Sequence, residues 1–134
     1  MLFRSRIVAE RLYRSRSWER LLRATDYWLN ANVNAAHAWY YRGASLKALG
    51  RPGALEAFEQ AVAKDPSVPG AQLALCVELY QSGSIAQSLV CSERLKGNEQ
   101  REQFEAQTFG HATYVYRATR RPSAAGREIK IIRH

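Results

Sequence analysis

Residues 39–66, WYYRGASLKALGRPGALEAFEQAVAKDP, contain the pattern that decides the fold of this chain. Two runs of apolar and small residues, spaced three or four positions apart, flank the turn at residues 50–53. The run before the turn is Trp39, Gly43 and Leu46, and the run after the turn is Ala54, Phe58 and Ala61. This spacing places the members of each run on one face of a helix. Glycine and proline suit the connection between them. The stretch therefore predicts two helices that pack against each other, with Gly43 allowing close approach.

The same pattern recurs on both sides of this stretch. Gly43 and Leu46 correspond to Cys76 and Leu79 in the following part of the chain and to Ala9 and Leu12 in the preceding part. The second run repeats as well, in the sets Leu21, Thr25 and Trp28, then Ala54, Phe58 and Ala61, then Ser88, Ser92 and Leu95. One helix pair cannot bury its apolar stripe alone, so three pairs in one register predict a stack of helix pairs.

The middle unit resembles the tetratricopeptide repeat, which carries W-x-x-L-G-x-x-Y, then A-x-x-x-F, and a closing proline, here Pro66. The resemblance covers about residues 5–96. It implies an all-α, right-handed superhelix of helix-turn-helix repeats with a concave face. Three positions depart from the pattern: Arg42 replaces its leucine, Val33 replaces a closing proline, and Arg16 stands where the other two units have glycine.

The repeat register ends near residue 96. We predict one further long helix over residues 99–119 and a short basic tail over residues 120–134, so the repeat domain is predicted to span residues 1–119. This last helix carries aromatic residues on two faces. We therefore predict that Phe109 or Tyr116 contacts another chain, which includes a second copy of this one. The alternative is a wide stripe facing the core of the same chain.

Length and composition agree with a single domain that can bury a core, since the chain has 134 residues of which 46% are apolar. No apolar run reaches the ~18 residues of a membrane helix. No apolar run of about 7 to 15 residues follows the basic start, which argues against a secretory signal. A mitochondrial presequence is disfavoured by Glu10 and Glu19. We therefore expect a cytoplasmic protein.

The two cysteines, Cys76 and Cys91, fall within the helices of the third unit. We expect them to be free, buried thiols, because a disulfide would need an oxidising compartment. The three histidines, His37, His111 and His134, are too scattered to make a metal site with them. No catalytic constellation or phosphate-binding glycine loop is visible either. We predict no cofactor, no metal and no enzyme activity.

The net charge of +8 is concentrated at the two ends of the chain. Residues 1–23 carry seven arginines against two glutamates, and residues 117–134 carry six cations against Glu128. This distribution is typical of a protein that meets a polyanion, an anionic lipid surface or an acidic protein. The alternative is solvated surface charge from codon bias, since 16 of the 20 cations are arginine.

In the architecture that the resemblance implies, the first helix of each unit lines the groove. The predicted partner-binding residues are Arg6, Tyr13, Arg14, His37, Tyr40, Lys47 and Tyr80. Ala44, Leu73 and Val77 lie on the same predicted face and leave too few donors for the carboxylate clamp of chaperone-binding members of the family. Tyrosines supply large contact areas and arginines bind carboxylates, so the predicted ligand is an acidic segment with apolar anchors.

The sequence thus predicts a protein–protein interaction module of the adaptor, chaperone or assembly-factor kind. Two alternatives stay open. The arginine-rich ends would suit a nucleic-acid or anionic-membrane binder, and the last helix would suit a structural subunit that docks into a larger complex.

Overall fold

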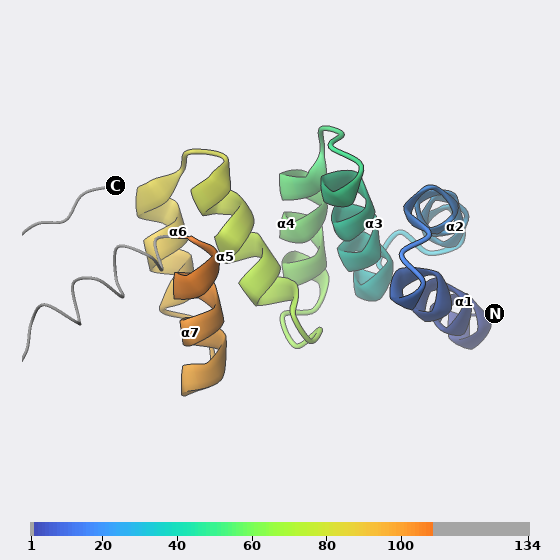
Figure 1. Cartoon of the computed structure of the whole chain (residues 1–134). Coiled ribbons are helices and arrows are strands. Elements are labelled where there is room, and N and C mark those ends of the chain that lie inside the picture. Colours follow the sequence, from blue (N-terminus) through green and yellow to red (C-terminus); the bar gives the residue numbers. More distant parts are fainter. Residues whose placement is uncertain (1, 109–134) are drawn as a thin grey trace, which may run out of the picture.

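The computed structural model describes residues 2–108, and this range is entirely helical, without strands (Figure 1). The seven helices of this range are α1 (Leu2–Arg14), α2 (Trp18–Ala31), α3 (Ala36–Ala48), α4 (Ala54–Lys64), α5 (Ala71–Gln81), α6 (Ile85–Ser92) and α7 (Gly97–Gln107). The predicted all-α class is therefore confirmed. The three predicted units correspond to α1–α2, α3–α4 and α5–α6.

The helices pack in the order of the chain. Each of α1 to α5 packs against the next one, α1 also contacts α3, and α7 contacts α5. Figure 1 shows α1 and α2 at one end of this row and α6 and α7 at the other. This arrangement buries one stripe of each helix against its neighbours, as expected of helix pairs that cannot bury their stripes alone.

All three units use the same left-handed turn after their first helix. Arg16, Gly50 and Gly83 have φ values of +57°, +69° and +98°. In each turn the next backbone N–H reaches back to a carbonyl five residues earlier, as in the 2.9 Å bond from Arg51 N to Leu46 O. This pair of features is the Schellman arrangement, which satisfies the last carbonyls of a helix. Arg16 therefore takes the glycine conformation despite its side chain.

The core of the middle unit depends on a size match between two helices. Gly43 on α3 faces Phe58 on α4, whose ring is only 2% exposed. A Cβ at Gly43 would lie 2.6 Å from the Phe58 ring, so the ring occupies the volume that a side chain would need. The glycine thus makes room for a partner side chain as well as for a neighbouring backbone.

The departure from the repeat pattern at Arg42 has a structural reason. Its guanidinium pairs with Asp26 on α2, and Arg51 pairs with Glu19 on the same helix. These two ion pairs connect the first unit to the second. Both are partly exposed, so each contributes a modest stabilisation.

The prediction of free thiols is wrong. Cys76 on α5 and Cys91 on α6 form a disulfide, with Cα atoms 5.4 Å apart. The two helices of a pair run side by side, and their crossing brings these two positions within bonding distance. Both residues are nevertheless buried, as expected.

The predicted helix over residues 99–119 can be compared with the structure only as far as Thr108, the last described residue. The helix begins earlier, at Gly97, and ends at Gln107. Phe104 buries its ring against the cluster of Val77, Leu79 and Leu95, which anchors α7 to the third unit. Phe109, Tyr116 and the predicted boundary at residue 119 lie outside the described residues. No helix within residues 2–108 has the length and apolar character needed to span a bilayer.

Candidate functional site

One cavity of about 530 Å³ is lined by residues of several helices, and four of these residues are aromatic. Its lining residues are Tyr13, Trp18, Tyr40, Ala44, Lys47, Ala48, Phe58, Gly70, Leu73, Ala74, Val77, Gln103 and Gln107. The odd-numbered helices α1, α3, α5 and α7 supply ten of these thirteen positions. We call this cavity the groove cavity.

Aromatic side chains form one end of the groove cavity. The rings of Tyr13 and Trp18 meet edge to face with centroids 5.7 Å apart, and Tyr13 and Tyr40 lie 6.3 Å apart. Tyr40 also packs on the buried Phe58, with centroids 6.0 Å apart. These geometries are favourable for aromatic pairs. The cavity therefore has one wall of aromatic rings that pack against each other.

Tyr40 has a larger structural role than the sequence suggested. Besides lining the groove cavity, its partly buried ring packs against three clusters of buried residues, those around Tyr41, Ala61 and Phe58. Burial, followed by a hydrogen bond with Tyr13, raises the pKa of Tyr40 well above its ordinary value. The hydroxyl is therefore neutral at physiological pH. Gly70, at φ +84°, leaves room for it, because a Cβ there would lie 3.1 Å from the Tyr40 oxygen.

The charge of the groove cavity is nearly balanced. Lys47 lines the cavity, and its Nζ lies 3.4 Å from Oε1 of Glu78 on α5. Gln103 and Gln107 of α7 supply neutral donors and acceptors on the facing side. A ligand therefore meets an aromatic and aliphatic surface with amide groups at the edge, and a lysine that is already engaged by a carboxylate.

The structure brings together part of the predicted groove set. Tyr13, Tyr40 and Lys47 all line the groove cavity, as do three further positions on the predicted face, Ala44, Leu73 and Val77. The remaining predicted residues, Arg6, Arg14, His37 and Tyr80, do not line it. Arg14 is instead paired with Glu10, one turn earlier on α1, at 2.7 Å.

His37 lies in the first turn of α3, within electrostatic reach of Arg6 and Asp65. Its Nε2 atom is buried and has no hydrogen-bond partner within the described chain. Burial is the main cause that lowers the pKa of His37, and the positive charge of Arg6 lowers it further. The imidazole is therefore neutral at pH 7, so it does not provide a cation for an acidic ligand.

Several lining residues escaped the sequence prediction. Trp18 begins α2, Gly70 precedes α5, and Gln103 and Gln107 belong to α7, none of which follows the groove register of the repeats. Trp18 reaches the cavity because its ring packs edge to face on Tyr13 across the turn of the first unit. The position of the two glutamines depends on the packing of α7 on α5. Neither contact leaves a signal in the spacing of the sequence.

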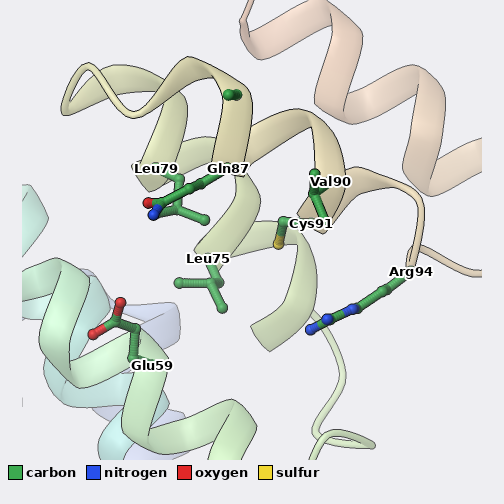
Figure 2. Close-up of a pocket in the computed structure, with 8 residues that line it drawn as sticks. Glu59, Leu75, Leu79, Gln87, Val90, Cys91 and Arg94 are labelled. Carbon is green, nitrogen blue, oxygen red and sulfur yellow. The ribbon is translucent and has the colours of Figure 1, made fainter.

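A second, smaller hollow of about 410 Å³ lies between α4 and α6 over α5 (Figure 2). Leu75 and Leu79 of α5 form its floor, and Glu59 and Arg94 stand at its two edges. An equivalent hollow between α2 and α4 is lined by Asp26, Arg42 and Leu46, the counterparts of Glu59, Leu75 and Leu79 in the preceding units. The hollow over α5 has no aromatic residue in its lining and the hollow between α2 and α4 has one, whereas the groove cavity has four, so we treat the groove cavity as the candidate site.

The described residues contain no candidate metal site. Within residues 2–108, no group of three or more histidine, cysteine, aspartate or glutamate side chains could hold a metal ion. No known family model matches this chain, and no curated protein matches it either. The function must therefore be argued from the geometry of the chain itself.

Proposed function

We propose that this chain is a tetratricopeptide-like repeat domain that binds a segment of a partner protein in its groove cavity. The proposal is supported by three helix pairs in one register, each with the same left-handed turn between its two helices, at Arg16, Gly50 and Gly83. A right-handed superhelix with a concave face formed by the odd-numbered helices is consistent with this packing.

The observation that carries the proposal is the composition of the cavity wall. Tyr13, Trp18 and Tyr40 offer ordered aromatic surface, and Ala44, Ala48 and Ala74 leave open space beside it. A volume of about 530 Å³ lies within the range of sites that hold ligand side chains. Rigid aromatic residues lose little conformational freedom on binding, which makes them effective contacts.

The partner segment is proposed to be mainly apolar, with a few acidic residues at its ends. Apolar side chains of the segment would fill the space above Ala44 and Leu73, while Gln103 and Gln107 would bind its backbone. Because Lys47 is engaged by Glu78 and Arg14 by Glu10, an acidic residue must compete with an internal carboxylate. Acidic residues would therefore contribute less to the affinity than the apolar anchors. An adaptor or assembly factor fits this mode, and we propose no enzyme activity.

The compartment that we propose differs from the sequence-based expectation. Disulfides that join helices are typical of proteins in oxidising compartments and are rare in the cytoplasm. Since Cys76 and Cys91 are bonded, we propose an oxidising compartment as the working environment.

The test uses a side chain placed in the cavity and a matched change outside it. Random peptides displayed on phage are selected for binding to the parent protein. The affinity of the selected peptides is then measured for the parent and for the variants Ala44→Arg and Ala63→Arg. Ala44 lines the cavity, whereas Ala63 is exposed on α4 and does not. We expect selected peptides with at least two apolar anchors, whose affinity falls at least about 30-fold in Ala44→Arg, the effect of one lost anchor of ~2 kcal/mol. Ala63→Arg should bind as the parent does. Equal binding by all three proteins would reject the groove cavity as the site.

A further inference from the structure

The carboxylates of the first unit are all occupied by ion pairs. Glu10 pairs with Arg14 at 2.7 Å, Glu19 pairs with Arg51, and Asp26 pairs with Arg42. Two of these three partners belong to the second unit. The first unit thus uses most of its negative charge to hold the array together.

This leaves the arginines of the first unit without compensation. Seven exposed arginines lie on α1, α2 and the turn between them, namely Arg4, Arg6, Arg11, Arg14, Arg16, Arg20 and Arg23. Apart from Arg14, none of them pairs with a carboxylate in the part of the chain that the structure describes. Uncompensated charge of one sign creates a local potential that attracts a polyanion.

The arginines alternate with exposed apolar side chains on the outer side of both helices. On α1, Arg4, Ile7, Val8 and Arg11 have the i, i+3, i+4, i+7 spacing of one helix face, and Ile7 and Val8 are 37% and 44% exposed. On α2, Arg20, Arg23 and Tyr27 have the i, i+3, i+7 spacing of one helix face, and Tyr27 is 78% exposed. Both faces point away from the buried residues Ala9 and Leu21. We call this set the arginine face; its members are Arg4, Ile7, Val8, Arg11, Arg20, Arg23 and Tyr27.

The arginine face lies at the free end of the array. Besides each other, α1 and α2 pack mainly against α3, so their outer sides are left uncovered by the described residues, as Figure 1 shows. Tyr13, which lines the groove cavity, points from a different side of α1 than Ile7 and Val8. A ligand on the arginine face therefore leaves the groove cavity accessible.

We propose that the arginine face binds the surface of an anionic lipid bilayer. Guanidinium groups bind phosphate oxygens in a bidentate manner and are weakly hydrated, which suits them to lipid phosphates. The exposed Ile7 and Val8 would enter the headgroup region, and Tyr27 has the amphipathic ring that is typical of membrane interfaces. Single-stranded nucleic acid is the less suitable partner, because it is held by stacking on several aromatic rings and this face carries one.

The experiment is co-sedimentation of the full chain with vesicles. Vesicles of phosphatidylcholine alone are compared with vesicles that also contain phosphatidylserine, at low and at physiological salt. We expect binding only to the vesicles with phosphatidylserine, weakened by salt. Each basic residue near an anionic surface strengthens binding by about fivefold, so Arg4→Gln with Arg11→Gln should weaken it by about 30-fold.

Matched control variants keep the proposal falsifiable. Arg94→Gln with Arg101→Gln removes the same charge from exposed positions at the other end of the array and should bind as the parent does. Ile7→Ser with Val8→Ser should weaken binding, whereas Ile85→Ser with Leu89→Ser, which changes exposed apolar residues of α6, should not. Equal losses in the two arginine pairs would refute the location of the site. Absence of binding to phosphatidylserine vesicles, with or without binding to a single-stranded RNA probe, would refute the proposal.

Discussion

Replacement of Gly43 by alanine tests the size match between α3 and α4. Two effects oppose each other at this position. In a helix interior, alanine is more favourable than glycine by ~0.8–1 kcal/mol. The new Cβ would, however, lie 2.6 Å from the Phe58 ring, which must move by about 0.8 Å to regain the 3.4 Å of an ordinary contact. Because Phe58 is only 2% exposed, its neighbours must move with it.

Overpacking of this kind destabilises by ~1–3 kcal/mol, so the steric effect exceeds the gain in helix propensity. We expect Gly43→Ala to lower the free energy of unfolding by about 1 kcal/mol and the melting temperature by about 4–8 °C. The assay is chemical and thermal denaturation followed by circular dichroism in the far ultraviolet. The repeat register supports this expectation, since the equivalent positions combine Ala9 with Thr25 and Cys76 with Ser92, each with a smaller partner than phenylalanine.

A double-mutant cycle isolates the contact. In a Phe58→Leu background the ring is absent, and Gly43→Ala should then be neutral or stabilising. The coupling free energy between the two positions should be at least about 1 kcal/mol. A higher melting temperature for Gly43→Ala in the parent background would refute the reasoning, because it would mean that the Phe58 ring yields at negligible cost.

Further predictions concern the turns, the disulfide and the partly buried His37. Gly50→Ala should destabilise the fold by ~1 kcal/mol or more through backbone strain alone, because φ is +69° and no atom lies within 4 Å of the new Cβ. Arg16→Gly at the equivalent turn should be neutral or stabilising. Urea denaturation of both variants measures this contrast. Reduction of the Cys76–Cys91 bond, which spans 15 residues, should lower the free energy of unfolding by roughly 3 kcal/mol, and the Cys76→Ala, Cys91→Ala variant should be insensitive to reductant. Burial lowers the pKa of His37, so the folded state favours the neutral imidazole. The stability that the neutral imidazole contributes is therefore present above the ordinary pKa of histidine. It is lost as the pH falls through the lowered pKa of the folded state. Urea midpoints measured between pH 7.5 and pH 5 should therefore decrease in the parent and decrease less in His37→Gln.

The positions of α1 to α6, their grouping into pairs and the turns at Gly50 and Gly83 were predictable from local patterns in the sequence. The spacing of Trp39, Gly43 and Leu46 identifies one face of a helix, and the recurrence of this spacing before and after the middle stretch identifies the units. These features are local, because a helix face depends only on the separation of residues along the chain. The resemblance to the repeat family implied that Tyr13, Tyr40 and Ala44 share one face of the array, and all three line the groove cavity.

The tertiary structure decided which distant side chains meet. Periodicity along the chain does not predict contacts between distant side chains. These contacts are the disulfide between Cys76 and Cys91, the ion pairs of Asp26 with Arg42 and of Glu19 with Arg51, and the place of Gln103 in the lining of the groove cavity. Each depends on how far one helix is rotated and shifted against the next. That rotation and shift are set by the fit of side chains across the contact, such as Phe58 over Gly43, and a pattern of spacings along one chain does not contain it.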